Sequence, residues 1–186
     1  LTSSIFTEDH VTPAQALRIA AVNGGTPELS EKQLNKLEFY LRTLAVPARR
    51  NIDNPVVRRG ERLLSDVGCV KCHTPTMKTG DHPVPQLANQ IIHPYTDLLL
   101  HDMGDELADS RPDHEATGNE WRTPPLWGIG LQKTVNGHTF LLHDGRARNV
   151  MEAILWHGGE AAESRRRVLE MPARDRDALL AFIQSL

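Results

Sequence analysis

The 186-residue sequence has no long apolar run, no strong excess of one charge and only two cysteines. Its apolar runs are far shorter than the roughly 18 residues that a membrane-spanning helix needs, so we expect no membrane span. The 21 basic and 24 acidic side chains leave a formal charge of −3, which gives no reason to expect a nucleic-acid or anionic-membrane partner. A chain of this length forms one domain with a real core, with room for an added helical arm.

Both cysteines lie in the stretch GCVKCH, from Gly68 to His73. A thioredoxin-like dithiol would need a strand before this motif, where the sequence has a helical pattern. A zinc site would need a second ligand pair, for which no further cysteine exists. Covalent haem accounts for all three residues, because Cys69 and Cys72 can each form a thioether on one helical turn while His73 binds the iron.

Helical patterns dominate the two ends of the chain, and strand patterns are weak. Capping residues and apolar periodicity predict helical segments over 12–25, 30–47, 54–68, 148–157, 161–170 and 172–186. Gly60 lies inside the third segment at a cost of about 1 kcal/mol relative to alanine, so we expect it either to allow close helix packing or to be a tolerated surface glycine. The segment 77–137 is rich in Pro, Gly, Asp and His, and loops that wrap a prosthetic group would explain its irregularity.

The second axial ligand of the iron has two main candidates, since imidazole and thioether sulfur are the usual partners of a histidine-ligated haem. Met103 follows His73 by 30 residues in a loop, although it could equally fill a gap in the core. His157 ends an amphipathic helix before two glycines, although it could equally be a cation at the end of a helix dipole. The other positions are less suitable: Met77 is too close to His73, His10 lies in the helical arm, and His82, His93, His114 and His138 lie in polar loops.

Three strings carry a resemblance to a known family: YTDLLLHDMGDELAD (95–109), EWRTPPLWGIGL (120–131) and LLHDGRARNVMEAILWHGGEA (141–161). Over about residues 14–186 the chain resembles the C-terminal haem domain of bacterial di-haem oxidoreductases, in the thiol oxidoreductase branch of the di-haem cytochrome c peroxidase superfamily. The resemblance implies an all-α, cytochrome c-like domain wrapped around one covalent haem, with long irregular loops. It also implies that the helix around Gly60 crosses the last helix near Phe182. We expect this haem domain over 51–186, after an N-terminal helical extension over 1–50.

The resemblance also separates the two candidates for the sixth ligand. In the peroxidases, this ligand is a methionine immediately before a glycine, on the helix that follows the HDG motif. His157 before Gly158 takes that place here, which favours bis-histidine coordination over ligation by Met103.

Other residues of the motifs are candidates for contact with the haem. Arg122 and Arg146 could pair with the propionates, unless they are ordinary surface arginines. Trp127 could line the haem, although core packing is the commoner duty of such residues and is expected of at least two of the three tryptophans. His143 is a candidate hydrogen-bonding residue of the haem pocket, with Asp144 and Gly145 shaping a turn.

Family members carry two haems, and the haem that meets peroxide belongs to an N-terminal domain whose own CxxCH motif is absent from this sequence. We therefore expect an electron-transfer domain that exchanges single electrons with a redox partner protein or an N-terminal haem domain. Two alternatives stay open: peroxidase or other substrate chemistry at this haem, and a haem-stabilised structural or binding module. Because haem c is attached outside the bacterial cytoplasmic membrane, we expect a periplasmic protein whose signal lies upstream of Leu1.

Overall fold

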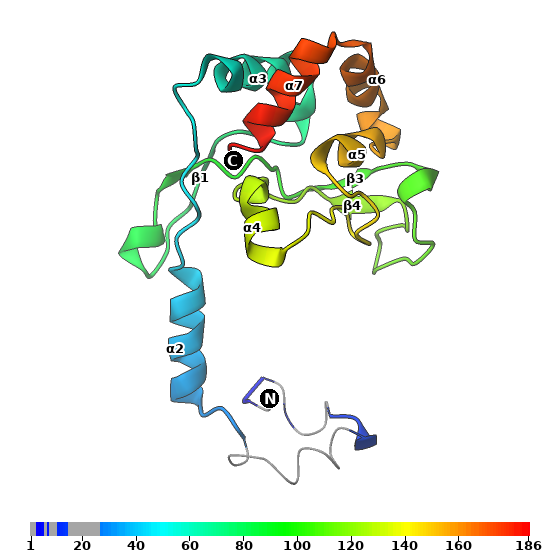
Figure 1. The fold of residues 1–186 in the computed structure, drawn as a ribbon. Helices are drawn as coiled ribbons and strands as arrows, with labels where there is room; N and C mark the ends of the chain where they lie inside the picture. Colours follow the sequence, from blue (N-terminus) through cyan, green and yellow to red (C-terminus); the bar gives the residue numbers. More distant parts are fainter. Residues whose placement is uncertain (1–2, 6, 8–10, 15–26) are drawn as a thin grey trace. The chain divides into compact units, whose positions relative to one another are not determined.

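The computed structural model describes residues 3–5, 7, 11–14 and 27–186, in two units, Leu1–Ala45 and Val46–Leu186 (Figure 1). Most of the helix predicted over 12–25, and the candidate His10, lie outside the described residues. In the first unit, helix α2 (Glu31–Arg42) begins after Ser30 with the predicted capping box. Leu37, Leu41 and Leu44, which contribute to the apolar periodicity of the helical segment predicted over 30–47, are exposed.

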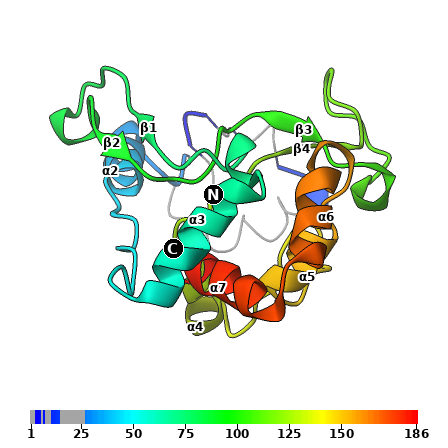
Figure 2. The ribbon, with the colours of Figure 1, turned by 90° about the horizontal axis from the view of Figure 1, so that it is seen from above.

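Two crossing helices, α3 (Pro55–Asp66) and α7 (Ala173–Ile183), form the centre of the second unit. Figures 1 and 2 show them lying across each other. The predicted start of α3 is confirmed, because the Asn54 side chain accepts a hydrogen bond from the Val56 N–H at 2.8 Å. The predicted role of Gly60 is also confirmed, since a Cβ there would lie 2.6 Å from Cβ of Phe182 and collide with the Ala178 carbonyl.

The apolar core surrounds this crossing. The predicted apolar side of the last helix is buried, with Leu179 and Phe182 fully enclosed. Helix α6 (Ala162–Glu170), which precedes α7 in the chain, adds Val168 to the core. Cys69 and Val70 pack against the same cluster, so the cysteine motif begins at the edge of the core.

The middle of the chain is irregular, as predicted, but it contains short strands that the all-α prediction misses. Strand β1 (Met77–Lys78) pairs with β2 (Ile91–Ile92), and β3 (Leu100–Asp102) pairs with β4 (Glu120–Arg122), both antiparallel. Strands of two or three residues are too short to produce a period of two in the sequence. Two short helices, α4 (Gln132–Asn136) and α5 (Val150–Leu155), complete the mainly helical unit. Within the described residues, no helix has the length and apolar character needed to cross a membrane.

Candidate functional site

The cysteine motif forms a tight turn directly after α3. Gly68 has a φ of 89°, a left-handed conformation that suits glycine, and it starts a 3-10 turn over Cys69–Lys71. The His73 N–H donates to the Cys69 carbonyl at 2.9 Å, which closes one helical turn around the two thiols. The chain therefore delivers Cys69, Cys72 and His73 together from the end of a helix whose inner face is buried.

The chemistry of the two thiols argues against a redox dithiol. Both cysteines are free. Burial raises the pKa of Cys69 to about 11, and burial followed by the charges of Asp97 and Glu160 raises the pKa of Cys72. A reactive dithiol needs the opposite shift, because the thiolate is the nucleophile.

A zinc interpretation finds little support either. In the described part of the chain, one group could hold a metal ion, formed by Cys72, Asp97 and His101 with ligand atoms within 4.8 Å of one another. This group leaves out Cys69 and His73. Moreover, both ring nitrogens of His101 already face carboxylates at 2.8 and 2.9 Å, so the imidazole has no free lone pair for a metal.

His73 presents one ring nitrogen to the protein and keeps the other unengaged. Its Nδ1–H donates to the Tyr95 carbonyl at 2.9 Å, and no hydrogen bond within the described residues involves Nε2. Burial lowers the pKa of His73 to about 4, so the ring is neutral at physiological pH. Tyr95 itself is buried edge-on against Phe182 and has a φ of 53°, a conformation uncommon for residues other than glycine. A neutral imidazole with a fixed tautomer and a free Nε2 is the form that binds a metal.

His157 has the same arrangement on a different segment. It follows α5, and its Nδ1–H donates to the Ala153 carbonyl at 2.7 Å. No hydrogen bond in the described range involves its Nε2, and burial lowers its pKa as well. Repulsion between the protonated forms of the two rings also contributes to the lowered pKa of His73, so the structure brings the two imidazoles into one neighbourhood.

Met103 belongs to the same neighbourhood through its backbone. A Cβ on Gly158 would lie 2.7 Å from the Met103 carbonyl oxygen, and a Cβ on Gly104 would lie 2.9 Å from the Gly159 nitrogen. The two glycines after His157 thus allow this segment to pack against the chain that follows β3. The two candidate segments for the sixth ligand are neighbours in space.

Two of the remaining candidates are already engaged by nearby groups. Arg146 contacts the Asp144 carboxylate at 2.6 Å and lies over the Trp156 ring at 4.9 Å from its centroid. His143 stacks on Trp121, with ring centroids 3.6 Å apart. The predicted turn is confirmed, since Gly145 has a φ of 75° and its N–H donates to the Leu142 carbonyl.

Arg122 and Trp127 have fewer partners. Arg122, at the end of β4, is exposed, and its side chain makes one long hydrogen bond among the described residues, to the Thr123 carbonyl at 3.5 Å. Its guanidinium keeps donors available for an anion. Trp127 is half-buried one residue beyond the buried Leu126.

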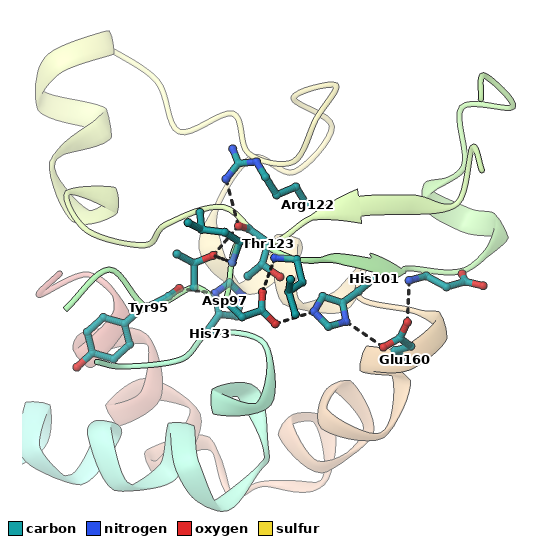
Figure 3. A network of polar contacts seen from close by, with 11 residues as sticks. His73, Tyr95, Asp97, His101, Arg122, Thr123 and Glu160 are labelled. Atoms are coloured by element: carbon teal, nitrogen blue, oxygen red, sulfur yellow. Dashed lines mark hydrogen bonds and ion pairs between the residues drawn. The ribbon is translucent and has the colours of Figure 1, made fainter. Parts of the chain in front are cut away.

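Sequence reasoning missed a polar cluster beside the cysteine motif, the carboxylate–imidazole triad of Asp97, His101 and Glu160 (Figure 3). His101 Nε2 lies 2.8 Å from the Asp97 carboxylate, and Nδ1 lies 2.9 Å from that of Glu160. Glu160 and then Asp97 raise the pKa of His101, which favours the doubly protonated ring. The four-residue spacing of Asp97 and His101 was visible in the sequence, but Glu160 lies 59 residues beyond His101.

Hydrogen bonds join the triad to the His73 side of the site. Thr96 N–H donates to the Thr74 carbonyl at 3.1 Å, and its hydroxyl donates to the Thr123 carbonyl at 2.6 Å. Residues 95–97 therefore contact the His73 turn, the residue that follows strand β4, and His101. The motifs YTD, RTPP and HGGE, far apart in the sequence, converge on this network.

Comparison with known proteins gives one family and one structural likeness. The family described as "Di-haem oxidoreductase, putative peroxidase" matches residues 3–186. None of the curated proteins matches the chain. A chain in a solved structure of Kuenenia stuttgartiensis hydrazine synthase is similar with a TM-score of 0.52 and 21% identity, over 85% of this chain and 56% of that one. This chain therefore spans little more than half the length of the hydrazine synthase chain, and at this identity the likeness concerns the fold alone.

Proposed function

This chain belongs to the di-haem oxidoreductase family, and from this premise we propose that it is a c-type cytochrome electron-transfer domain. Cys69 and Cys72 would hold one haem c by thioether bonds, and His73 and His157 would be its axial ligands. A haem bound in this way supplies one-electron chemistry at its iron. The haem domain covers 51–186 in this proposal, after a helical extension over 1–50.

One observation carries the proposal: two imidazoles have the same hydrogen-bonding pattern and the same neutral protonation state. His73 and His157 each donate Nδ1–H to a backbone carbonyl, at 2.9 and 2.7 Å, and each leaves Nε2 unengaged among the described residues. Burial lowers the pKa of both rings, so both are neutral at physiological pH. These features suit two axial ligands with fixed tautomers, and they favour a low-spin iron that passes electrons without binding substrate.

The other candidates fit the proposal to different degrees. Arg122 is the better propionate partner, because its guanidinium is exposed and weakly engaged. Arg146 is bound to Asp144 and Trp156, so its role in the proposal is to support the pocket wall. Trp127 would line the haem, and His143 would offer a polar contact from its place on Trp121.

The proposal includes a partner and a location. The family is di-haem and this sequence contains one CxxCH motif, so the electron partner would be an N-terminal haem domain or a separate redox protein. Covalent attachment of haem c takes place outside the bacterial cytoplasmic membrane, so the protein would work in the periplasm.

Substrate chemistry at this haem is the second candidate function, because the family description names a peroxidase. It would need a sixth position that is open or easily vacated. The electron-transfer proposal also has an alternative form, in which Met103 would be the sixth ligand in place of His157, since its backbone lies beside Gly158.

Absorption and electron paramagnetic resonance spectra of the ferric protein distinguish these functions. We expect a low-spin bis-imidazole spectrum that peroxide leaves unchanged and that cyanide changes only slowly, and we expect His157→Ala to convert the iron to high spin. Met103→Leu is the matched control and should leave the spectrum unchanged. A high-spin wild type that reacts rapidly with peroxide would favour the peroxidase function, and a haem that exchanges no electrons with any donor would favour a structural module.

A further inference from the structure

Glu160 connects the His157 segment to β3 with both of its carboxylate oxygens. Oε1 accepts a hydrogen bond from the Asp102 N–H at 3.0 Å, and Oε2 accepts one from His101 Nδ1–H at 2.9 Å. Glu160 lies three residues beyond His157, with only the two glycines and one turn between them. One side chain therefore fixes the end of the proposed ligand segment to a neighbouring strand.

His101 passes this connection on toward His73. The ring is largely buried, with 15% of its side chain exposed, and Nε2 donates to Asp97 at 2.8 Å. Asp97 is held in turn by the Leu99 N–H at 3.0 Å, and the carbonyl two residues earlier, that of Tyr95, accepts from His73. A continuous line of hydrogen bonds and short backbone steps thus runs from one proposed axial ligand to the segment of the other (Figure 3).

The glycines make the position of the His157 segment sensitive to this connection. Gly158 and Gly159 pack directly against the backbone of 102–104, and Gly159 has a φ of 48°. Packing without side chains supplies little burial of apolar surface to hold the segment. Charged hydrogen bonds are the stronger contacts available here, and Glu160 makes two of them.

We infer that Glu160 is a positioning residue that holds His157 on the haem iron, by fixing the 157–160 segment to His101 and Asp102. The inference rests on the proposed function, because it requires His157 as the sixth ligand. It goes beyond that function because it assigns to Glu160, a carboxylate that does not touch the iron, control over how readily external ligands replace the sixth ligand. Losing Glu160 should let His157 dissociate more often and so admit external ligands.

The test is the rate of cyanide binding to the ferric haem protein. In Glu160→Ala we expect the rate to rise roughly threefold to tenfold, as the loss of two charge-assisted hydrogen bonds of a half-exposed side chain allows. Glu160→Gln keeps the shape and an acceptor for the Asp102 N–H, so we expect a smaller rise and a fold that survives. Glu163→Gln is the matched control, because this exposed carboxylate pairs with Arg166 and Arg167 on its own helix and should leave the rate unchanged.

A double-mutant cycle separates positioning from general loosening. His101→Gln alone should also speed cyanide binding, and adding it to Glu160→Ala should give much less than the product of the two effects, since both remove the same bond. Multiplicative effects, or rates for both Glu160 variants equal to that of Glu163→Gln, would overturn the inference while leaving the proposed function intact. If His157→Ala leaves the low-spin spectrum unchanged, both the ligation and the inference fail.

Discussion

The two proposed axial histidines share one hydrogen-bonding pattern but lie in different surroundings. The His73 turn follows α3, and its carbonyl acceptor belongs to Tyr95, whose ring packs edge-on against Phe182 with centroids 5.6 Å apart. His157 follows a helix of six residues and is succeeded by glycines and the carboxylate–imidazole triad. One ligand is therefore anchored beside the apolar core, and the segment that follows the other ligand is held by polar contacts near the surface.

The apolar contacts of the core near His73 are also worth more free energy than the polar contacts that follow His157. Full burial of a leucine or phenylalanine is worth about 1.5–3 kcal/mol, and Leu64, Leu179 and Phe182 all belong to the core cluster against which Cys69 packs. Exposed ion pairs contribute about 0–1 kcal/mol, and the Glu160 side chain is 55% exposed. We therefore expect His157 to dissociate from the iron before His73 does, when the protein is heated or when an external haem ligand is added.

The largest effect is expected from removing the covalent attachment of the haem beside His73. In Cys69→Ser combined with Cys72→Ser, no thiol is left in the chain, so no thioether can form. We expect the wild type to keep its haem on a denaturing gel, as seen by haem staining, and the double variant to lose all of it. Mass spectrometry of each single variant tests whether the remaining thiol still carries haem. Haem that stays with the double variant under denaturing conditions would refute thioether attachment.

A matched pair of glycine substitutions sharpens the comparison. Gly60→Ala places a Cβ against Ala178 and Phe182 in the core, so we expect a loss of about 2 kcal/mol in the free energy of unfolding, after the gain in helix propensity. Gly159→Ala puts a Cβ against the Asp102 carbonyl at a φ of 48°, which costs about 1–2 kcal/mol locally. Chemical denaturation measures the first effect and the ferric spin state measures the second.

The two variants should affect different observables. Gly60→Ala should keep the low-spin spectrum in the folded protein, and Gly159→Ala should add a high-spin component with a smaller shift of the unfolding midpoint. If Gly159→Ala destabilises the whole domain as strongly as Gly60→Ala, the two sides are not independent and the comparison fails.

The helices of the core beside the His73 turn were predictable from the sequence, because the patterns that indicate them are local. Asn54 and Pro55 predict the start of α3, and apolar periodicity predicts the buried side of α7. The close approach at Gly60 could also be predicted, since a glycine inside a helix needs a reason. The position of His157 at a helix end was likewise predicted, although its role as a ligand is still a prediction.

The polar contacts beside the His157 segment could not be predicted, because they join residues far apart in the sequence. Strand β3 has three residues and shows no period in the sequence. Glu160 meets His101 across 59 residues, and no spacing rule connects the two. The sequence indicated that 77–137 is irregular, but it did not indicate that Asp97, His101 and Thr123 would organise that segment.

The smallest expected effect is a pH dependence on the core side, at the Arg49–Glu61 pair. Two hydrogen bonds of 2.7 and 2.8 Å join the side chains, and the Arg49 guanidinium lies 4.7 Å from the Phe182 ring centroid. The hydrogen bond from Arg49 holds the pKa of Glu61 below its ordinary value of 4.5. A lowered pKa in the folded state stabilises the protein above the ordinary value, and this contribution is lost as the pH falls through the folded-state pKa.

Glu61→Gln should therefore lower the free energy of unfolding at pH 7 by less than about 1 kcal/mol, because the pair is partly exposed. The difference from wild type should stay constant down to about pH 5 and shrink at lower pH, as denaturant titrations at a series of pH values would measure. Asp53→Asn is the control, since its pair with Arg58 is far more exposed. A difference that grows on acidification would show that Glu61 is stabilised in its protonated form. In that case the pair would not support the apolar anchor of the His73 side as we describe it.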